Sequence, residues 1–162
     1  MLGLRLVYLA ALAAWLGGLL ALGGVAAPTI FAVAQANDPA SGRVLAGTMF
    51  GAVLARFHLV AAVCGALMIV TLVAMALVGP RPRPYAARFV VIALMLLATA
   101  AVAVPVGRGI ARLQRESGRA INTLPADDAR RVAFTRLHGL SNVLLLANVA
   151  GGLLLLAWEA RR

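Results

Sequence analysis

Long uncharged stretches alternate along this chain with short stretches that hold nearly all of its charged residues. Four uncharged stretches are long enough to cross a membrane: Leu6–Asn37, Phe57–Pro80, Phe89–Gly107 and Leu137–Trp158. A helix needs about 20 apolar residues to cross the hydrocarbon core, and it satisfies its own backbone polar groups in lipid. We therefore predict four transmembrane helices, over residues 6–28, 55–79, 88–107 and 134–158.

Two further segments lie beside these spans. Residues 41–54 are too short to cross a bilayer and predict a lead-in helix to the second span, at the membrane interface. Residues 108–124 predict an amphipathic helical extension of the third span, with arginines at helical spacing on one face. These arginines are Arg108, Arg112, Arg115 and Arg119, and the opposite face carries Ile110, Leu113, Ile121 and Leu124. We expect the extension to lie on lipid headgroups; the alternative is an anion site in which Arg108 and Arg112 bind a phosphate or a cofactor carboxylate.

Composition narrows the class of protein further. Of the 162 residues, 63% are hydrophobic and 12% are charged, and the mean hydropathy is +0.96. A soluble domain has about a quarter charged residues, so these few charges could not cover a surface that faces water. The composition excludes a soluble enzyme and a disordered chain. It predicts one all-α domain over residues 1–162, an integral membrane four-helix bundle.

The charge distribution indicates a lipid partner. The net charge is +10, and the basic residues are all arginines that flank the apolar stretches. We therefore expect contact with anionic lipid headgroups and no nucleic-acid partner. Four spans place both termini on one face, called side A here, and the loops near residues 38–41 and 108–136 on the other, called side B. Side B carries more arginines than side A, which favours side B on the cytoplasmic side. Arg5 and the short loop at residues 81–83 favour side A there instead. The orientation in a bacterial cytoplasmic (inner) membrane therefore stays open.

A weak internal repeat relates the two halves of the chain. Val25–Pro28 in the first span resembles Val102–Pro105 in the third, and Arg56–His58 resembles Arg136–His138 at the start of the second and fourth spans. Each half is then a helical hairpin in the same orientation, which is the arrangement of a parallel repeat about the membrane normal.

The repeat places His58 and His138 at equivalent positions just inside side B. One interpretation is that each imidazole hydrogen-bonds to a neighbouring helix and fixes the packing. A second is that the pair ligates a haem b between the second and fourth spans, in a space that small residues beside His58 leave open. A third is a transition-metal or proton-relay site, although two imidazoles are too few for a closed zinc site.

The segment Phe134–Ser141 contains the residues His138, Gly139, Leu140 and Ser141, and so resembles the HGLS signature of the transmembrane protein 205-like family. The rest of the chain is similar to that family in the same order, at Trp15, Gly17, Pro28, Phe31, Phe50, Phe57, His58, Pro105 and Arg136. The resemblance implies a four-span fold and a role for the two histidines, but no catalytic activity. Members often carry an asparagine two turns after the motif histidine, where this chain has Leu145.

No catalytic triad, carboxylate pair or phosphate loop is present in the sequence. Small residues at helical spacing allow helices to approach closely in lipid. They are Gly47, Gly51 and Ala55, and also Ala14 with Gly18. We therefore predict a polytopic membrane protein without catalytic activity, an accessory or interaction module that forms a homo-oligomer or joins a larger membrane complex. The alternatives are a module that binds haem or metal through its histidines and a transporter of a small solute or ion.

Overall fold

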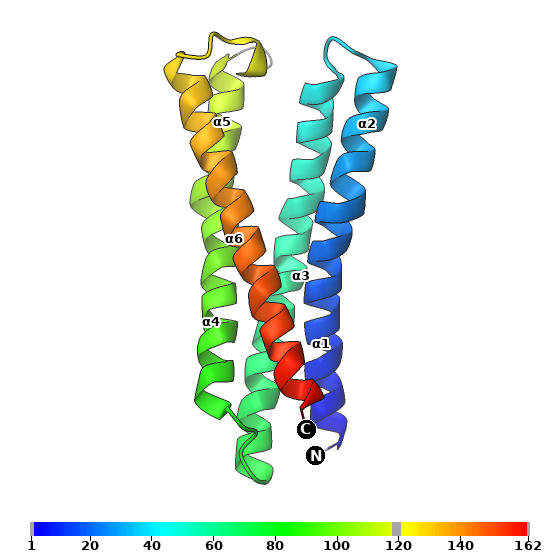
Figure 1. The fold of residues 1–162 in the computed structure, drawn as a ribbon, viewed down its shortest axis with the longest axis vertical. Helices are drawn as coiled ribbons and strands as arrows, with labels where there is room; N and C mark the ends of the chain where they lie inside the picture. Colours follow the sequence, from blue (N-terminus) through cyan, green and yellow to red (C-terminus); the bar gives the residue numbers. More distant parts are fainter. Residues whose placement is uncertain (1, 118–120, 162) are drawn as a thin grey trace.

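The computed structural model describes residues 2–117 and 121–161, and these residues form four long helical rods that pack side by side (Figure 1). The first rod contains α1 (Leu2–Ala21), the π-helical segment η1 (Leu22–Ala26) and α2 (Ala27–Asn37), and the second is α3 (Gly42–Val78). The third contains α4 (Tyr85–Ala101), the π-helical segment η2 (Val102–Val106) and α5 (Gly107–Ser117). The fourth is α6 (Ala129–Ala160), and the short 3-10 helix η3 (Ile121–Thr123) precedes it. All four rods are long and apolar enough to cross a membrane.

The rods are longer than the predicted spans. The first has 36 residues and α3 has 37, so each is about 55 Å long, whereas the hydrocarbon core is about 30 Å thick. The predicted lead-in helix at 41–54 and the second span are one continuous helix. Isolated charges such as Arg56 end an uncharged window without ending a helix, which is why the windows predicted shorter elements.

The first and third rods each contain a π-helical turn near a proline. Pro28 lies in the first turn of α2, directly after η1, and Pro105 lies within η2. Proline lacks a backbone N–H and its ring crowds the preceding turn, and a wider π turn accommodates both effects. The first span was predicted to end at Pro28, and the helical rod itself continues past this proline to Asn37.

The main apolar core joins all four rods in the half of the molecule nearer side A. Its fully buried members include Leu12 and Trp15 of α1, Leu72 of α3, Ile92 of α4 and Leu155 of α6. Both termini lie at this end (Figure 1). Toward side B the rods diverge into two pairs, α2 with α3 and α5 with α6 (Figure 1).

A second apolar cluster holds the α5–α6 pair together at side B. Leu113 of α5, with Ile121 and Leu124 of the following loop, packs against Phe134 and Leu137 of α6. The amphipathic pattern of residues 108–124 is thus confirmed, but its apolar face is covered by α6. The apolar face of this segment thus meets α6 and not lipid, and α5 continues the line of α4 (Figure 1). Contact of its arginines with lipid headgroups stays a prediction.

Candidate functional site

A small cavity lies inside the bundle where the two helix pairs begin to diverge. Its volume is about 30 Å³, which is room for about one water molecule. All four rods contribute to its wall, and the lining residues are Leu19, Leu54, Phe57, His58, Thr99, Val102, Ser141, Leu145 and Asn148. A cavity of this size with several polar groups suits a water molecule or a ligand of similar size.

The polar groups of the cavity come from three helices. The Thr99 hydroxyl donates to the Met95 carbonyl at 2.9 Å and lies 3.4 Å from Asn148 Oδ1, so it connects α4 to α6. The Asn148 amide donates to the Leu144 carbonyl of its own helix at 3.1 Å. In residues 2–117 and 121–161, neither His58 nor Ser141 has a hydrogen-bond partner. Their polar atoms therefore supply the unpaired hydrogen-bonding capacity of the cavity.

The structure does not bring the two histidines into one cavity. His58 is half-buried and lines the cavity, whereas His138 is exposed and stacks on Phe134 of its own helix, with the ring centroids 5.9 Å apart. Within the HGLS signature, Gly139 and Leu140 are also exposed, and Ser141 is the residue that reaches the cavity wall. The predicted hydrogen bonds from the histidines to neighbouring helices are absent from the part of the chain that the structure describes.

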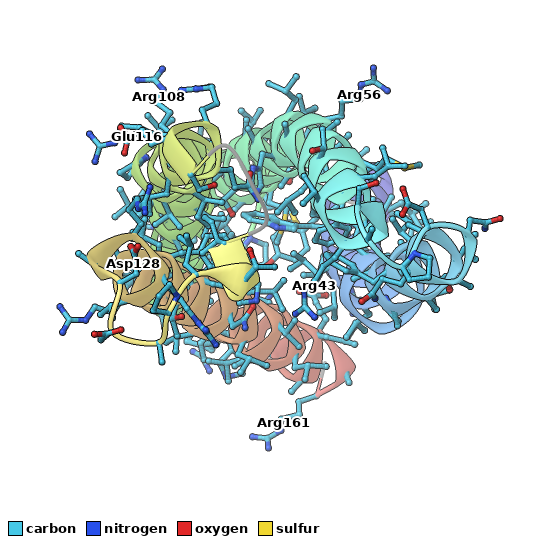
Figure 2. All side chains as sticks on the ribbon, turned by 90° about the horizontal axis from the view of Figure 1, so that it is seen from above. Arg43, Arg56, Arg108, Glu116, Asp128 and Arg161 are labelled. Carbon is cyan, nitrogen blue, oxygen red and sulfur yellow. The ribbon has the colours of Figure 1, made fainter. Side chains whose placement is uncertain are left out.

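The arginine stripe of α5 faces away from this cavity. Arg108, Arg112 and Arg115 are exposed, and Arg119 lies outside the described residues. Arg112 Nε lies 3.7 Å from the Glu116 carboxylate one turn further along the helix. Arg108 and Arg56 point outward at the edge of the molecule, whereas Arg43 lies over the opening between the two helix pairs (Figure 2).

A second polar site, which the sequence analysis did not predict, lies at the side A end of the bundle. Arg88 of α4 is fully buried, and Glu159 near the end of α6 is 5% exposed. Arg88 Nη1 donates to Glu159 Oε1. Arg5 Nε donates to Glu159 Oε2 at 2.9 Å, and the Arg88 guanidinium lies 5.9 Å from the centroid of the Tyr8 ring. One carboxylate thus holds two guanidinium groups from different helices.

This ionic cluster was missed because its charged members lie at the boundaries of uncharged windows. Arg5, Arg88 and Glu159 served only to mark where the uncharged stretches begin and end. Tyr8, within the first stretch, is fully buried and faces Arg88. One signal was available: Glu159 is the one acidic residue of side A in the sequence, among six arginines, so it needs a basic partner.

The fold and the two buried polar sites define an integral membrane bundle of four spans. Residues 10–119, from α1 through α5, match the family described as a domain of unknown function, DUF4149, and the chain belongs to this family. No curated protein and no solved structure matches the chain. The HGLS residues and the whole of α6 lie beyond the matched range.

Proposed function

We propose that this protein is a non-enzymatic accessory module of a membrane assembly and that it associates through the small-residue face of α3. The observation that supports this proposal is the uncovered part of that face. Gly51 and Ala55 are exposed, and no other side chain lies within 4 Å of the position that a Cβ atom on Gly51 would occupy. A surface of this kind lets the backbone of a second helix approach closely in lipid.

Glycines elsewhere in the bundle are covered by neighbouring helices. A Cβ atom on Gly18 would clash with the ring of Phe57, and one on Gly65 would lie 2.9 Å from Trp15 Cζ3. A Cβ atom on Gly152 would lie 3.1 Å from Leu16 Cδ1. These contacts join α1 to α3 and α1 to α6, so the fold uses its small residues for close packing. The uncovered face at Gly51 supports the same use between molecules.

The oligomeric state in mild detergent tests this proposal. We expect the purified protein to form particles of more than one 16.7 kDa chain, or to co-purify with a partner at fixed stoichiometry. Gly51→Leu fills the face and is expected to release the monomer. Ala52→Leu is the matched control, because Ala52 is also exposed but points about 100° away on the same helix. A monomeric wild type in every detergent, or equal effects of the two variants, would contradict the proposal.

Anionic lipids are the proposed contact for the exposed arginines of side B. Arg56, Arg108 and Arg136 are exposed, and each lies between 22 and 24 residues from the side A end of its helical rod. That separation is about 33–36 Å at the rise of an α-helix, close to the hydrocarbon thickness. The three guanidinium groups are thereby proposed to lie at one headgroup level, in a bacterial cytoplasmic (inner) membrane.

Haem ligation by His58 and His138 stays a prediction of the sequence. A porphyrin is far larger than the 30 Å³ cavity at His58, so ligation requires the helix pairs to separate and His138 to turn inward. An absorption spectrum after haem-replete expression tests this alternative, and a Soret band lost on replacement of either histidine would support it. Transport of a small solute or ion also stays a prediction, for which flux into liposomes is the test.

We further propose that DUF4149 and the transmembrane protein 205-like family are the same family, with two homologous hairpins per chain. Trp15, Pro28, Phe57 and Pro105 support the first part, because they resemble the transmembrane protein 205-like family and lie within the range that matches DUF4149. The positions of η1 and η2 support the second, because η2 begins eighty residues after η1, and His138 follows His58 by the same interval. The two prolines used to recognise the repeat, Pro28 and Pro105, are 77 residues apart and do not share this interval.

A further inference from the structure

The ionic cluster at side A leaves part of a buried guanidinium unused. Arg88 is fully buried and pairs with Glu159 through Nη1. Its two other donor atoms, Nε and Nη2, are also buried and have no hydrogen-bond partner in the described residues. A buried donor without a partner costs free energy, and the cost is larger for a charged group. The unused donors of Arg88 therefore call for an acceptor that residues 2–117 and 121–161 do not supply.

The two unused donors define the shape of that acceptor. Nε and Nη2 lie on the same edge of the planar guanidinium and point in parallel, so they match two oxygen atoms of one phosphate or carboxylate. The Tyr8 ring, 5.9 Å from the guanidinium carbon, packs against the same group and restricts its orientation. The two donors therefore have the arrangement that binds an anion through two oxygen atoms.

The charge of the cluster favours an anion as well. Arg5 and Arg88 both pair with the carboxylate of Glu159, so these three described side chains carry one positive charge in excess. An excess charge at a buried site in a membrane protein is costly unless a counter-charge is present. One bound monoanion would neutralise the cluster.

We propose that the Nε/Nη2 edge of Arg88 binds a phosphate group at the side A surface of the membrane. Arg5, whose side chain is 41% exposed, is the member of the cluster that reaches the surface, and the phosphate approaches beside it. The cluster joins the first turn of α1, the first turn of α4 and the end of α6, at the level where lipid headgroups lie. The phosphate comes either from a lipid headgroup or from solution.

Binding to the purified protein in detergent tests the proposal and separates the two sources. The probes are phosphatidylglycerol, diacylglycerol with the same acyl chains, and inorganic phosphate alone, each titrated and followed by native mass spectrometry. We expect phosphatidylglycerol to bind more tightly than diacylglycerol. Binding of inorganic phosphate at the same site would identify free phosphate as a source, whereas its absence would assign the site to lipid.

Two variants connect the binding to Arg88. Arg88→Lys keeps the charge and removes the paired donors, so we expect affinity to fall by about tenfold or more. Arg81→Lys, at an exposed position between α3 and α4, is the matched control and is expected to bind as the wild type does. Equal binding by the wild type and Arg88→Lys, or no preference of the wild type for any phosphate probe, would overturn the proposal.

A third variant keeps the proposal testable if Arg88→Lys does not fold. Glu159→Gln removes the internal carboxylate that competes for the two arginines, so the proposal predicts tighter phosphate binding. A purely structural role of the cluster predicts a less stable protein with no gain in affinity. A folded Glu159→Gln protein that binds phosphate no more tightly than the wild type would count against the site.

Discussion

Single glycines decide how closely the helices pack in the half of the bundle nearer side A. Gly65 of α3 is buried, and a Cβ atom there would lie 2.5 Å from Leu96 Cδ2 and 2.9 Å from Trp15 Cζ3. Trp15 is fully buried and cannot move aside without disturbing the core. A single hydrogen atom at Gly65 is therefore what allows α1, α3 and α4 to meet around the indole ring.

Gly65→Ala is expected to destabilise the protein by about 1–3 kcal/mol, the usual cost of overpacking a core. Gly17→Ala is the control, because Gly17 is exposed on α1 with open space beside it. Alanine is favoured over glycine in a helix by up to about 1 kcal/mol, so the control is expected to be neutral or stabilising. Thermal unfolding in detergent measures both, and a Gly65→Ala protein as stable as Gly17→Ala would contradict this account.

At the level of residues, the family resemblance drew attention to Trp15, and the structure places this side chain fully buried in the core. Sequence reasoning did not find the pairing of Arg88 with Glu159. These two residues are 71 positions apart, and only the packing of α4 against α6 brings them together.

At the level of elements, local hydrogen bonds fix the start of α6. The Asp128 side chain accepts from the Arg130 backbone N–H at 2.8 Å and from the Arg130 guanidinium at 2.7 Å. A carboxylate at a helix N-terminus satisfies a backbone donor and interacts favourably with the helix dipole. Hydrogen bonds from the Arg130 side chain, and then from its backbone, lower the pKa of Asp128 from 3.8 to about 2.

This lowered pKa predicts the pH range in which the cap acts. The folded pKa lies below the unfolded value, so the contribution of the cap is complete above about pH 4 and is lost as the pH falls toward 2. Asp128→Ala is expected to speed amide hydrogen exchange in the first turn of α6 at neutral pH. Asp127→Ala, at the exposed neighbouring position, is the control. Equal exchange in the two variants would show that the carboxylate of Asp128 does not cap the helix.

Periodicity predicted the existence of the elements better than their extents. The arginine stripe and its apolar opposite face predicted α5 correctly, because both follow from helical spacing. The partner of the apolar face was assigned wrongly, since the pattern describes a buried face without saying whether lipid or α6 covers it. The continuous α3 was divided in two, because a lone Arg56 interrupts hydropathy but not backbone hydrogen bonding.

At the level of the whole molecule, the architecture followed directly from hydropathy. Four stretches of sufficient length require four helices, and an even number of spans puts both termini on one side, as Figure 1 shows. The divergence toward side B could not be predicted in this way. It depends on where the interior residues meet, and the large core stops near the level of the cavity at His58.

Cysteine labelling tests this topology. Cys64 is buried, so the wild type is expected to react little with a membrane-impermeant maleimide. Arg43→Cys and Arg161→Cys place a thiol at exposed positions near side B and side A respectively. In vesicles of one orientation, we expect one variant to react from outside and the other only after the membrane is opened. Labelling of both from the same face would contradict the four-span arrangement.

The divergence of the two helix pairs has a consequence for the surface of the membrane. The rods share one core near side A and form two separate pairs toward side B (Figure 1). If Arg56 and Arg108 lie at the headgroup level, as proposed, the diverging pairs extend beyond the hydrocarbon core. Each pair then offers its own surface to water or to a partner on side B.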